Sequence, residues 1–295
     1  MLKILKLILS VFIGILVQST AINAADSDYW QTQVAAISGF AQPAGSSENI
    51  PGVEVIVLET GQTVAYTDSS GNYSFEYPVG QSMTLMFRKN GYKTSQTGTF
   101  TVPPEGFSGL HNNITYQAIG HKLYELMKYA VEITSLELIK SDACQLITTV
   151  TAYGKTLYDD PQGEPGATLS VQDQSGKTHH GKTCYFGIFR GKTLPVCFNQ
   201  KTSEDGGVFV LNLEAKPNRD IPNDIHPENN PYQVIASKPG LEYSENNSYQ
   251  VIASKPGLKF STHNANCNPE WWARHAPGED MLINMSPPQG PTVLH

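Results

Sequence analysis

One stretch of sequence, Thr67-Asp68-Ser69-Ser70-Gly71-Asn72-Tyr73-Ser74-Phe75, decides the predicted fold. Asp, Ser and Gly in succession are typical of a tight turn, in which Gly71 supplies the backbone freedom. Tyr73 and Phe75 then alternate with polar residues, which is the period of a strand with one buried face. The stretch therefore predicts a turn that leads into an amphipathic strand.

Short strand-like runs flank this stretch on both sides, each bounded by turn residues. They are Val34–Phe40, Val53–Leu58, Gln62–Thr67, Met83–Arg88, Thr97–Val102 and Asn113–Ala118. Short strands at this spacing are typical of an antiparallel sandwich. We therefore expect residues 25–118 to form a first β-sandwich.

The pattern changes in residues 119–142, which we expect to link two domains. Apolar residues recur there at steps of three and four, namely Leu123, Leu126, Met127 and Ala130. This is helical spacing and predicts a helix over residues 120–131. An extended linker with a chance pattern is the alternative. Strand-like runs resume afterwards, and residues 143–286 are predicted to form a second sandwich, followed by a flexible tail at 287–295.

The two β regions carry the same signals in the same order. Pro51-Gly52-Val53 corresponds to Pro165-Gly166-Ala167, and the turn at residues 67–71 corresponds to residues 202–206. Two copies of one sandwich plan explain this order economically.

The order of strand, Pro-Gly, strand, Thr-Asp-x-x-Gly-x-Tyr-x-Phe, strand and Lys-x-Gly-Tyr resembles a carboxypeptidase regulatory-like domain. The resemblance covers residues 34–118 and, less cleanly, residues 144–286. It implies an all-β protein of two tandem transthyretin-like or Ig-like antiparallel β-sandwiches joined by a short helix. In metallocarboxypeptidases this domain carries no catalytic residues, and elsewhere the same plan resembles carbohydrate-binding and surface modules.

A second repeat is local and nearly identical, since residues 228–244 recur as residues 245–261. One sandwich needs this strand once, and an exposed spare strand is a pairing liability. We expect the second copy in the core and the first in an edge hairpin. The alternative is a duplication without function.

The N-terminal residues 1–24 have the order of a signal peptide. Lys3 and Lys6 precede an apolar run, and small residues end at Ala24, the expected cleavage site. The apolar run is short for a membrane span, which needs about 20 residues. We therefore expect an exported protein, periplasmic or secreted, that does not span the membrane after cleavage. An uncleaved membrane anchor is the alternative.

The net charge of −7 becomes −9 for the mature chain, because Lys3 and Lys6 are the only charged residues in 1–24. An acidic chain without a basic stripe is a poor nucleic-acid binder, so we expect no nucleic-acid partner.

The four cysteines, an even number, predict two disulfides in an oxidising compartment. Three pairings are open, and we prefer Cys184–Cys197, which would tie a hairpin, with Cys144–Cys267, which would tie the ends of one domain. A zinc site is the rival interpretation, but no Cys-x-x-Cys pair is present.

Several apparent motifs lack the context that their chemistry needs. Residues 176–183 satisfy the P-loop pattern, but a strand-like run follows instead of a helix, so no nucleotide site is expected. Adjacent His179 and His180 point opposite ways on an extended chain. Acidic residues of the 214–231 loop could bind calcium, but their spacing matches no standard site, namely Asp220, Asp224 and Glu228. No cofactor or metal is expected.

Trp271 and Trp272 form the most distinctive pair of aromatic residues. Neighbours in a strand face opposite sides, so one of them could be exposed and stack on a sugar ring or anchor a protein. We favour the other interpretation, in which both are packed, one in the core and one against the domain junction, since aromatic residues mostly serve burial.

These observations predict an exported, non-catalytic binding or structural module of the cell envelope or surface. Its expected partner is a carbohydrate or an envelope or surface protein. A protein–protein interaction or adhesion scaffold is the alternative to carbohydrate binding, and an accessory protein of a hydrolase is the third interpretation.

Overall fold

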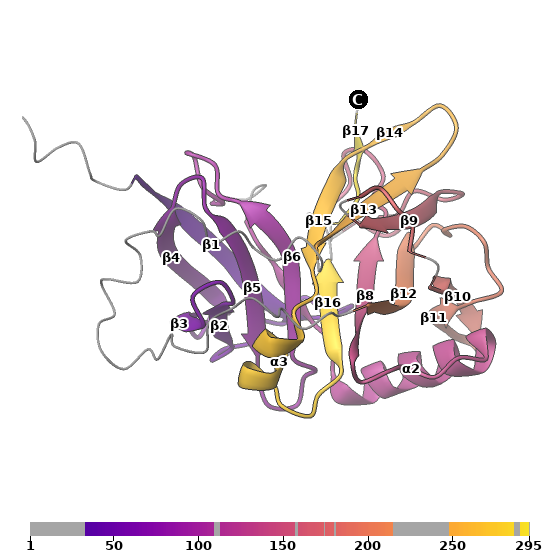
Figure 1. Ribbon diagram of the computed structural model, residues 1–295, viewed down its shortest axis with the longest axis horizontal. Coiled ribbons are helices and arrows are strands. Elements are labelled where there is room, and N and C mark those ends of the chain that lie inside the picture. The colour runs from indigo at the N-terminus through magenta and orange to yellow at the C-terminus, as the bar shows by residue number, and fades with distance from the viewer. Residues whose placement is uncertain are drawn as a thin grey trace, which may run out of the picture. The chain divides into compact units, whose positions relative to one another are not determined.

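The computed structural model describes residues 33–108, 113–156, 159–173, 175–179, 181–214, 248–285 and 290–294. The predicted signal peptide, the first copy of the local repeat and the acidic residues of the 214–231 loop lie outside these ranges. The described part is mostly β with two helices (Figure 1). Neither of these helices has the length and apolar character of a membrane span. Nearly all described residues belong to one compact unit, Ala35–His295.

The first half of the chain forms two groups of strands that share a core. The strands are β1 (Val34–Pro43), β2 (Glu54–Val57), β3 (Gln62–Tyr66), β4 (Asn72–Pro78), β5 (Ser82–Arg88), β6 (Ser95–Thr101) and β7 (Tyr116–Ala118). One group has the order β4-β1-β7 and the other the order β3-β2-β5-β6. Tyr73 and Tyr116 of the first group meet Phe87 of the second, whose ring stacks on Tyr116 at 4.6 Å. The predicted turn and strand thus place Tyr73 in the core.

The helix predicted over residues 120–131 is present as α2 (His121–Ser135). It ends where Leu136 adopts a left-handed conformation with φ of 61°. Its buried side chains include Tyr124, Met127 and Ala130, and it packs against β10 and β11. Leu123, which belongs to the predicted apolar pattern, lies instead on the exposed side.

The described part of the second half has ten strands and a short helix. They are β8 (Ala143–Thr149), β9 (Thr168–Asp173), β10 (Thr183–Phe189), β11 (Lys192–Val196), β12 (Gly207–Glu214), β13 (Ser248–Ser254), β14 (Lys259–Phe260), β15 (Thr262–Asn266), α3 (Pro269–His275), β16 (Met281–Met285) and β17 (Val293–Leu294).

One hydrogen-bonded sheet runs through both halves, in the order β11-β10-β12-β8-β16-β6-β15-β13-β9 (Figure 1). β6 is the strand at the junction: Gln96 pairs with Ile283 of β16, and Thr99 pairs with Asn264 of β15. The halves are therefore joined by backbone pairing as well as by α2. Two separate tandem sandwiches remain a prediction.

The second copy of the local repeat forms β13, which pairs with β9 on one side and β15 on the other. Its side chains alternate, with Tyr249, Val251 and Ala253 buried. This central position is the one expected for the second copy. The edge hairpin expected for the first copy concerns residues outside the described ranges and remains a prediction.

Candidate functional site

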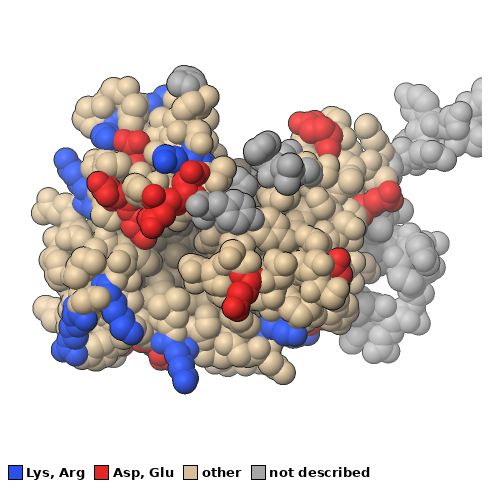
Figure 2. All heavy atoms as spheres, turned by 180° about the vertical axis from the view of Figure 1, so that it is seen from behind, with Lys and Arg blue, Asp and Glu red and all other residues tan. Residues whose placement is uncertain are grey.

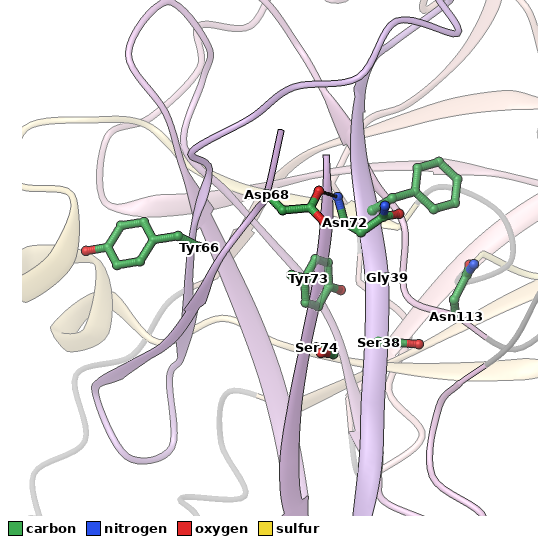
Figure 3. Close-up of a pocket in the computed structure, with 9 residues that line it drawn as sticks. Ser38, Gly39, Tyr66, Asp68, Asn72, Tyr73, Ser74 and Asn113 are labelled. Atoms are coloured by element: carbon green, nitrogen blue, oxygen red, sulfur yellow. Dashed lines mark hydrogen bonds between the residues drawn. The ribbon is translucent and has the colours of Figure 1, made fainter. Parts of the chain in front are cut away.

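A surface pocket of about 570 Å³ lies beside the turn at Asp68 (Figure 3). The Asp68 carboxylate accepts hydrogen bonds from the backbone N–H groups of Ser70 (2.8 Å) and Asn72 (2.9 Å). The Tyr73 hydroxyl donates to the carbonyl oxygen of Ile114. These polar groups hold the turn and the strands together, so they are poorly placed to serve a ligand.

The tryptophan pair lies on α3 and not on a strand, which corrects the geometry expected from sequence. Asn268 caps this helix by accepting a hydrogen bond from the N–H of Glu270 (3.0 Å), and Pro269 occupies the first turn. Trp271 and Trp272 are 7% and 2% exposed, so neither ring offers a face to a ligand. The structure places both indoles as packing residues.

The disulfides join the preferred pairs of cysteines, Cys144–Cys267 and Cys184–Cys197. The first links β8 to the residue after β15, and the second closes the β10–β11 hairpin. Disulfides of this kind indicate an extracytoplasmic location, because reducing compartments do not maintain them.

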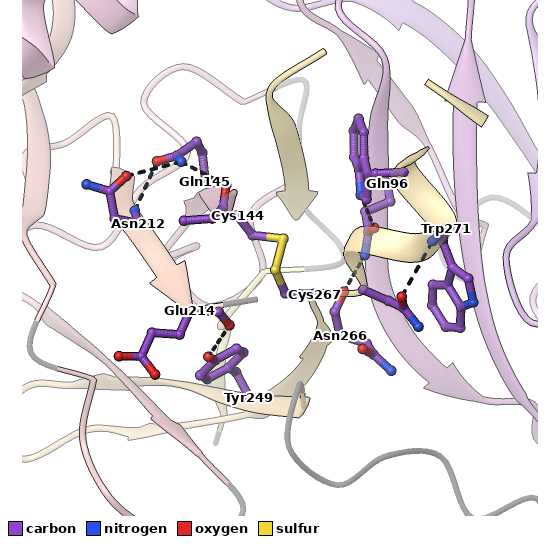
Figure 4. The surroundings of a disulfide bond; sticks show 12 residues. Gln96, Cys144, Gln145, Asn212, Glu214, Tyr249, Asn266, Cys267 and Trp271 are labelled. Carbon is purple, nitrogen blue, oxygen red and sulfur yellow. Dashed lines mark hydrogen bonds between the residues drawn. A yellow bond between two sulfur atoms is a disulfide. The ribbon is translucent and has the colours of Figure 1, made fainter. Parts of the chain in front are cut away.

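Gln96 connects the two halves close to the Cys144–Cys267 disulfide (Figure 4). Its side-chain oxygen accepts from Nε1 of Trp272 at 2.8 Å, and its nitrogen donates to the backbone carbonyl of Asn266 at 2.6 Å. Because Gln96 is buried, both bonds are shielded from water. This amide thus serves the junction rather than a ligand.

The segment with the P-loop pattern leads into strand β10, which begins at Thr183, so no helix N-terminus follows it. The His179 ring nitrogen contacts the carbonyl oxygen of Leu211 at 3.3 Å, and His180 lies outside the described residues. Among the residues that the structure describes, no three His, Cys, Asp or Glu side chains group closely enough to hold a metal ion. On the face shown in Figure 2, basic side chains lie apart from one another and form no continuous stripe.

A second surface pocket, here called the polar groove, has a volume of about 500 Å³. It is lined by residues of the neighbouring strands β5, β6, β15 and β13 and by Glu59. Its polar lining comes from Glu59, Ser82, Thr99, Ser248, Gln250, Asn264 and Asn266. No Lys, Arg or His is among the described residues that line it. Sequence reasoning named none of these residues, although the alternation of Ser248 and Gln250 with Tyr249 and Val251 already placed the polar pair on one face of a strand.

Glu59 closes one end of the polar groove. Its carboxylate accepts from the backbone N–H of Thr84 at 2.8 Å and from the Thr84 hydroxyl at 2.7 Å. The Thr84 hydroxyl, having donated its proton to Glu59, accepts from Thr99 at 2.9 Å. Burial raises the pKa of Glu59 to about 7, and the two bonds from Thr84 oppose this rise. Near neutral pH this carboxyl group can therefore donate as well as accept a hydrogen bond.

Residues 36–116 match the sequence model of the carboxypeptidase regulatory-like domain. The model matches the chain once, over these residues. The match agrees with the resemblance seen in the turn at residues 67–75 and the strands around it. It does not reach residues 144–286, so a second copy stays a prediction. No curated protein matches the chain.

Among solved structures, similar chains include the TIE protein of Bacillus anthracis, with 14% identity and a TM-score of 0.23. The match covers 86% of this chain and 33% of the TIE protein. The shaft pilin SpaA of Lactobacillus rhamnosus GG has 9% identity and a TM-score of 0.23, with 90% of this chain and 99% of the pilin covered. The minor pilin GBS52 of Streptococcus agalactiae has 8% identity and a TM-score of 0.25, with 88% and 97% covered. This chain spans about a third of the TIE protein. TM-scores of this size do not establish a shared arrangement of strands.

Proposed function

We propose that the protein is exported and acts outside the cytoplasm, in the envelope or at the surface, as a non-catalytic module that binds carbohydrate. The observation that carries the proposal is the polar groove, whose lining combines amides, hydroxyls and one carboxyl group. Each of these groups can donate and accept hydrogen bonds when the carboxyl is protonated, as sugar hydroxyls also do. The match to a carboxypeptidase regulatory-like domain supports a module without catalytic residues.

Export is tested by analysing the mature chain. Mass spectrometry of the protein recovered outside the cytoplasm should find an N-terminus at Ala25 and both disulfides intact. A chain that remains in the cytoplasm with residues 1–24 attached would contradict export.

Carbohydrate binding is tested on a glycan array with the mature protein in its oxidised form. Reproducible binding to a subset of glycans is expected. A blank array, with the protein shown to be folded by circular dichroism, would contradict this function.

A second candidate function, protein–protein interaction, is favoured by exposed apolar residues at the end of α2. Leu136 and Leu138 are 91% and 75% exposed, and Ile133 is also exposed. Such exposure on neighbouring residues is typical of contact surfaces. Chemical crosslinking at the cell surface should then recover a partner that a Leu136→Ser, Leu138→Ser double variant loses. If crosslinking finds no partner and no self-association, this candidate fails.

A further inference from the structure

A row of polar side chains crosses four neighbouring strands in the polar groove. Gln250 of β13 pairs with Asn264 of β15, and Asn264 pairs in turn with Thr99 of β6. Thr99 then pairs with Thr84 of β5, over which Glu59 lies. Residues that are paired directly across a sheet present their side chains on the same face. The row therefore runs at right angles to the strands and ends at a carboxyl group.

The length of this row fits a short linear ligand. Neighbouring strands lie about 4.8 Å apart, so the row from β13 to β5 spans about 14 Å. The strand spacing is close to the length of one pyranose unit in a linear glycan. Successive sugar units can thus meet successive strands, and Gln250, Asn264 and Thr99 stand where each unit would need a partner.

Asn266 adds a buried acceptor without a protein partner to the lining of the polar groove. It is only 6% exposed, and its side-chain oxygen has no hydrogen-bond partner among the described residues. A buried acceptor without a donor costs about 1–3 kcal/mol, and such groups call for an explanation. Asn266 pairs with Ser248 across β13 and β15, two residues along each strand from the pair Gln250–Asn264 and on the same face. The oxygen itself is buried, so a ligand hydroxyl would remove this cost only after the Asn266 side chain turned toward the groove.

The lining also narrows the chemical class of the ligand. Anionic ligands are usually held by Arg or Lys, and neither residue type is among the described lining residues. Tyr249, the aromatic residue that lines the groove, is only 6% exposed, so its ring offers little surface for stacking. Its hydroxyl donates a hydrogen bond to the carbonyl oxygen of Glu214 at 2.6 Å (Figure 4). Recognition must then come from hydrogen bonds to a neutral, hydroxyl-rich molecule rather than from charge or ring stacking.

We infer that the polar groove binds a linear, uncharged oligosaccharide laid across the strands, with about one sugar unit for each strand. This inference rests on the carbohydrate-binding function proposed above, and it adds the contacting residues, the orientation of the ligand and its lack of charge. Asn264 lies inside the row, between Gln250 and Thr99, and contacts an inner sugar unit.

The test uses the mature, oxidised chain and a glycan array that carries linear neutral di-, tri- and tetrasaccharides beside sialylated and sulfated glycans. The variants Asn264→Ala and Gln250→Ala remove exposed side chains of the row, so both should fold. Thr262→Ala is the matched control, because Thr262 is exposed on the same strand as Asn264 and lies outside the lining. Wild type and the control should bind neutral trisaccharides at least tenfold more tightly than Asn264→Ala does.

Each other result has a definite meaning. Binding that survives both groove variants would overturn the groove as the site while leaving carbohydrate binding intact. Selective binding of sialylated or sulfated glycans would overturn the uncharged ligand. Disaccharides bound as tightly as trisaccharides would overturn the orientation across the strands. A blank array with wild type would overturn the proposed function itself.

Discussion

Glu59 illustrates how one residue can serve a site at a cost to the fold. Desolvation favours its protonated form, while the two hydrogen bonds from Thr84 favour the carboxylate. The pKa of about 7 in the folded chain lies above the ordinary value of 4.5. Between these values the folded protein binds more protons than the unfolded chain does. Stability from this group is therefore full below pH 4.5 and is lost as the pH rises through 7.

Glu59→Gln should remove this loss. The glutamine oxygen can still accept from the N–H of Thr84, and its amide can donate to the Thr84 hydroxyl. We expect the free energy of unfolding at pH 8 to exceed that of wild type by about 1–3 kcal/mol, with no difference of that size near pH 4. Urea unfolding at both pH values measures this. The exposed Glu76→Gln on β4 is the control, and an equal gain in that variant would refute the assignment to burial.

At this scale the sequence predicts chemistry best where a residue type has a single common use. Cys144, Cys184, Cys197 and Cys267 were assigned to two pairs because export leaves few other roles for them. Glu59 carries no such signal, since it stands in a turn and acquires its environment from β5 and β6. Asn264 likewise becomes a candidate only through its pairing with Thr99, which lies far away in the chain.

At the scale of elements, strand β13 shows that the second copy of the local repeat supplies a central strand of the sheet. Its slot between β9 and β15 is filled by residues 248–254, and the alternation of Tyr249, Val251 and Ala253 satisfies the core. Deleting residues 228–244 should therefore leave a folded protein, with a change in unfolding free energy below about 1 kcal/mol from the shorter connection. Thermal unfolding by circular dichroism is the measurement. Adding Val251→Asp to the deletion should abolish folding, and loss of folding in the deletion alone would count against the idea.

The two disulfides differ in the length of chain that they close. Cys144–Cys267 spans 123 residues and Cys184–Cys197 spans 13. In the chain-entropy model a loop of about 100 residues gives about 4.7 kcal/mol and one of about 15 gives about 3 kcal/mol. Replacing the first pair by Ala should thus lower the unfolding free energy by about 1–2 kcal/mol more than replacing the second. Equal losses in urea titrations would show that chain entropy does not set the difference.

The type of a secondary-structure element was predictable where the local sequence signals agree, as in the β10–β11 hairpin. It was missed where a signal for a helix start was overlooked, as in α3. Arg190-Gly191 sits between β10 and β11 with positive φ at both residues, as a tight hairpin requires. The prediction for the tryptophan pair used strand geometry, although Asn268-Pro269-Glu270 is a helix-start signal that indicates α3.

For the whole molecule, the junction at β6 could not be predicted from sequence. It rests on two single-residue pairings, Gln96 with Ile283 and Thr99 with Asn264. These residues are far apart in the sequence, and no local sequence pattern predicts that they pair. The prediction of two separate halves follows from the repeated turn signals. Each signal concerns the local structure of one half and carries no information about strand pairing between the halves. Side-chain contacts add to the pairing, since Lys93 forms an ion pair with Glu279 at 3.0 Å.

This junction predicts that the chain unfolds in a single cooperative transition instead of half by half. Separating the halves would remove the strands that pair with β6 at the junction. It would also break the two hydrogen bonds that Gln96 makes with the Trp272 indole N–H and the Asn266 carbonyl, each with a net contribution of about 0.5–1.5 kcal/mol. In a Trp30→Phe background, fluorescence reports Trp271 and Trp272 on α3 while far-ultraviolet circular dichroism reports all strands. The two melting curves should coincide, and the calorimetric and van't Hoff enthalpies should agree.

Gln96→Ala should lower the midpoint of unfolding and begin to separate the two melting curves, because it removes both side-chain hydrogen bonds across the junction. Two resolved transitions in the protein that retains Gln96 would mean that the halves fold independently and that the shared sheet contributes little to their coupling.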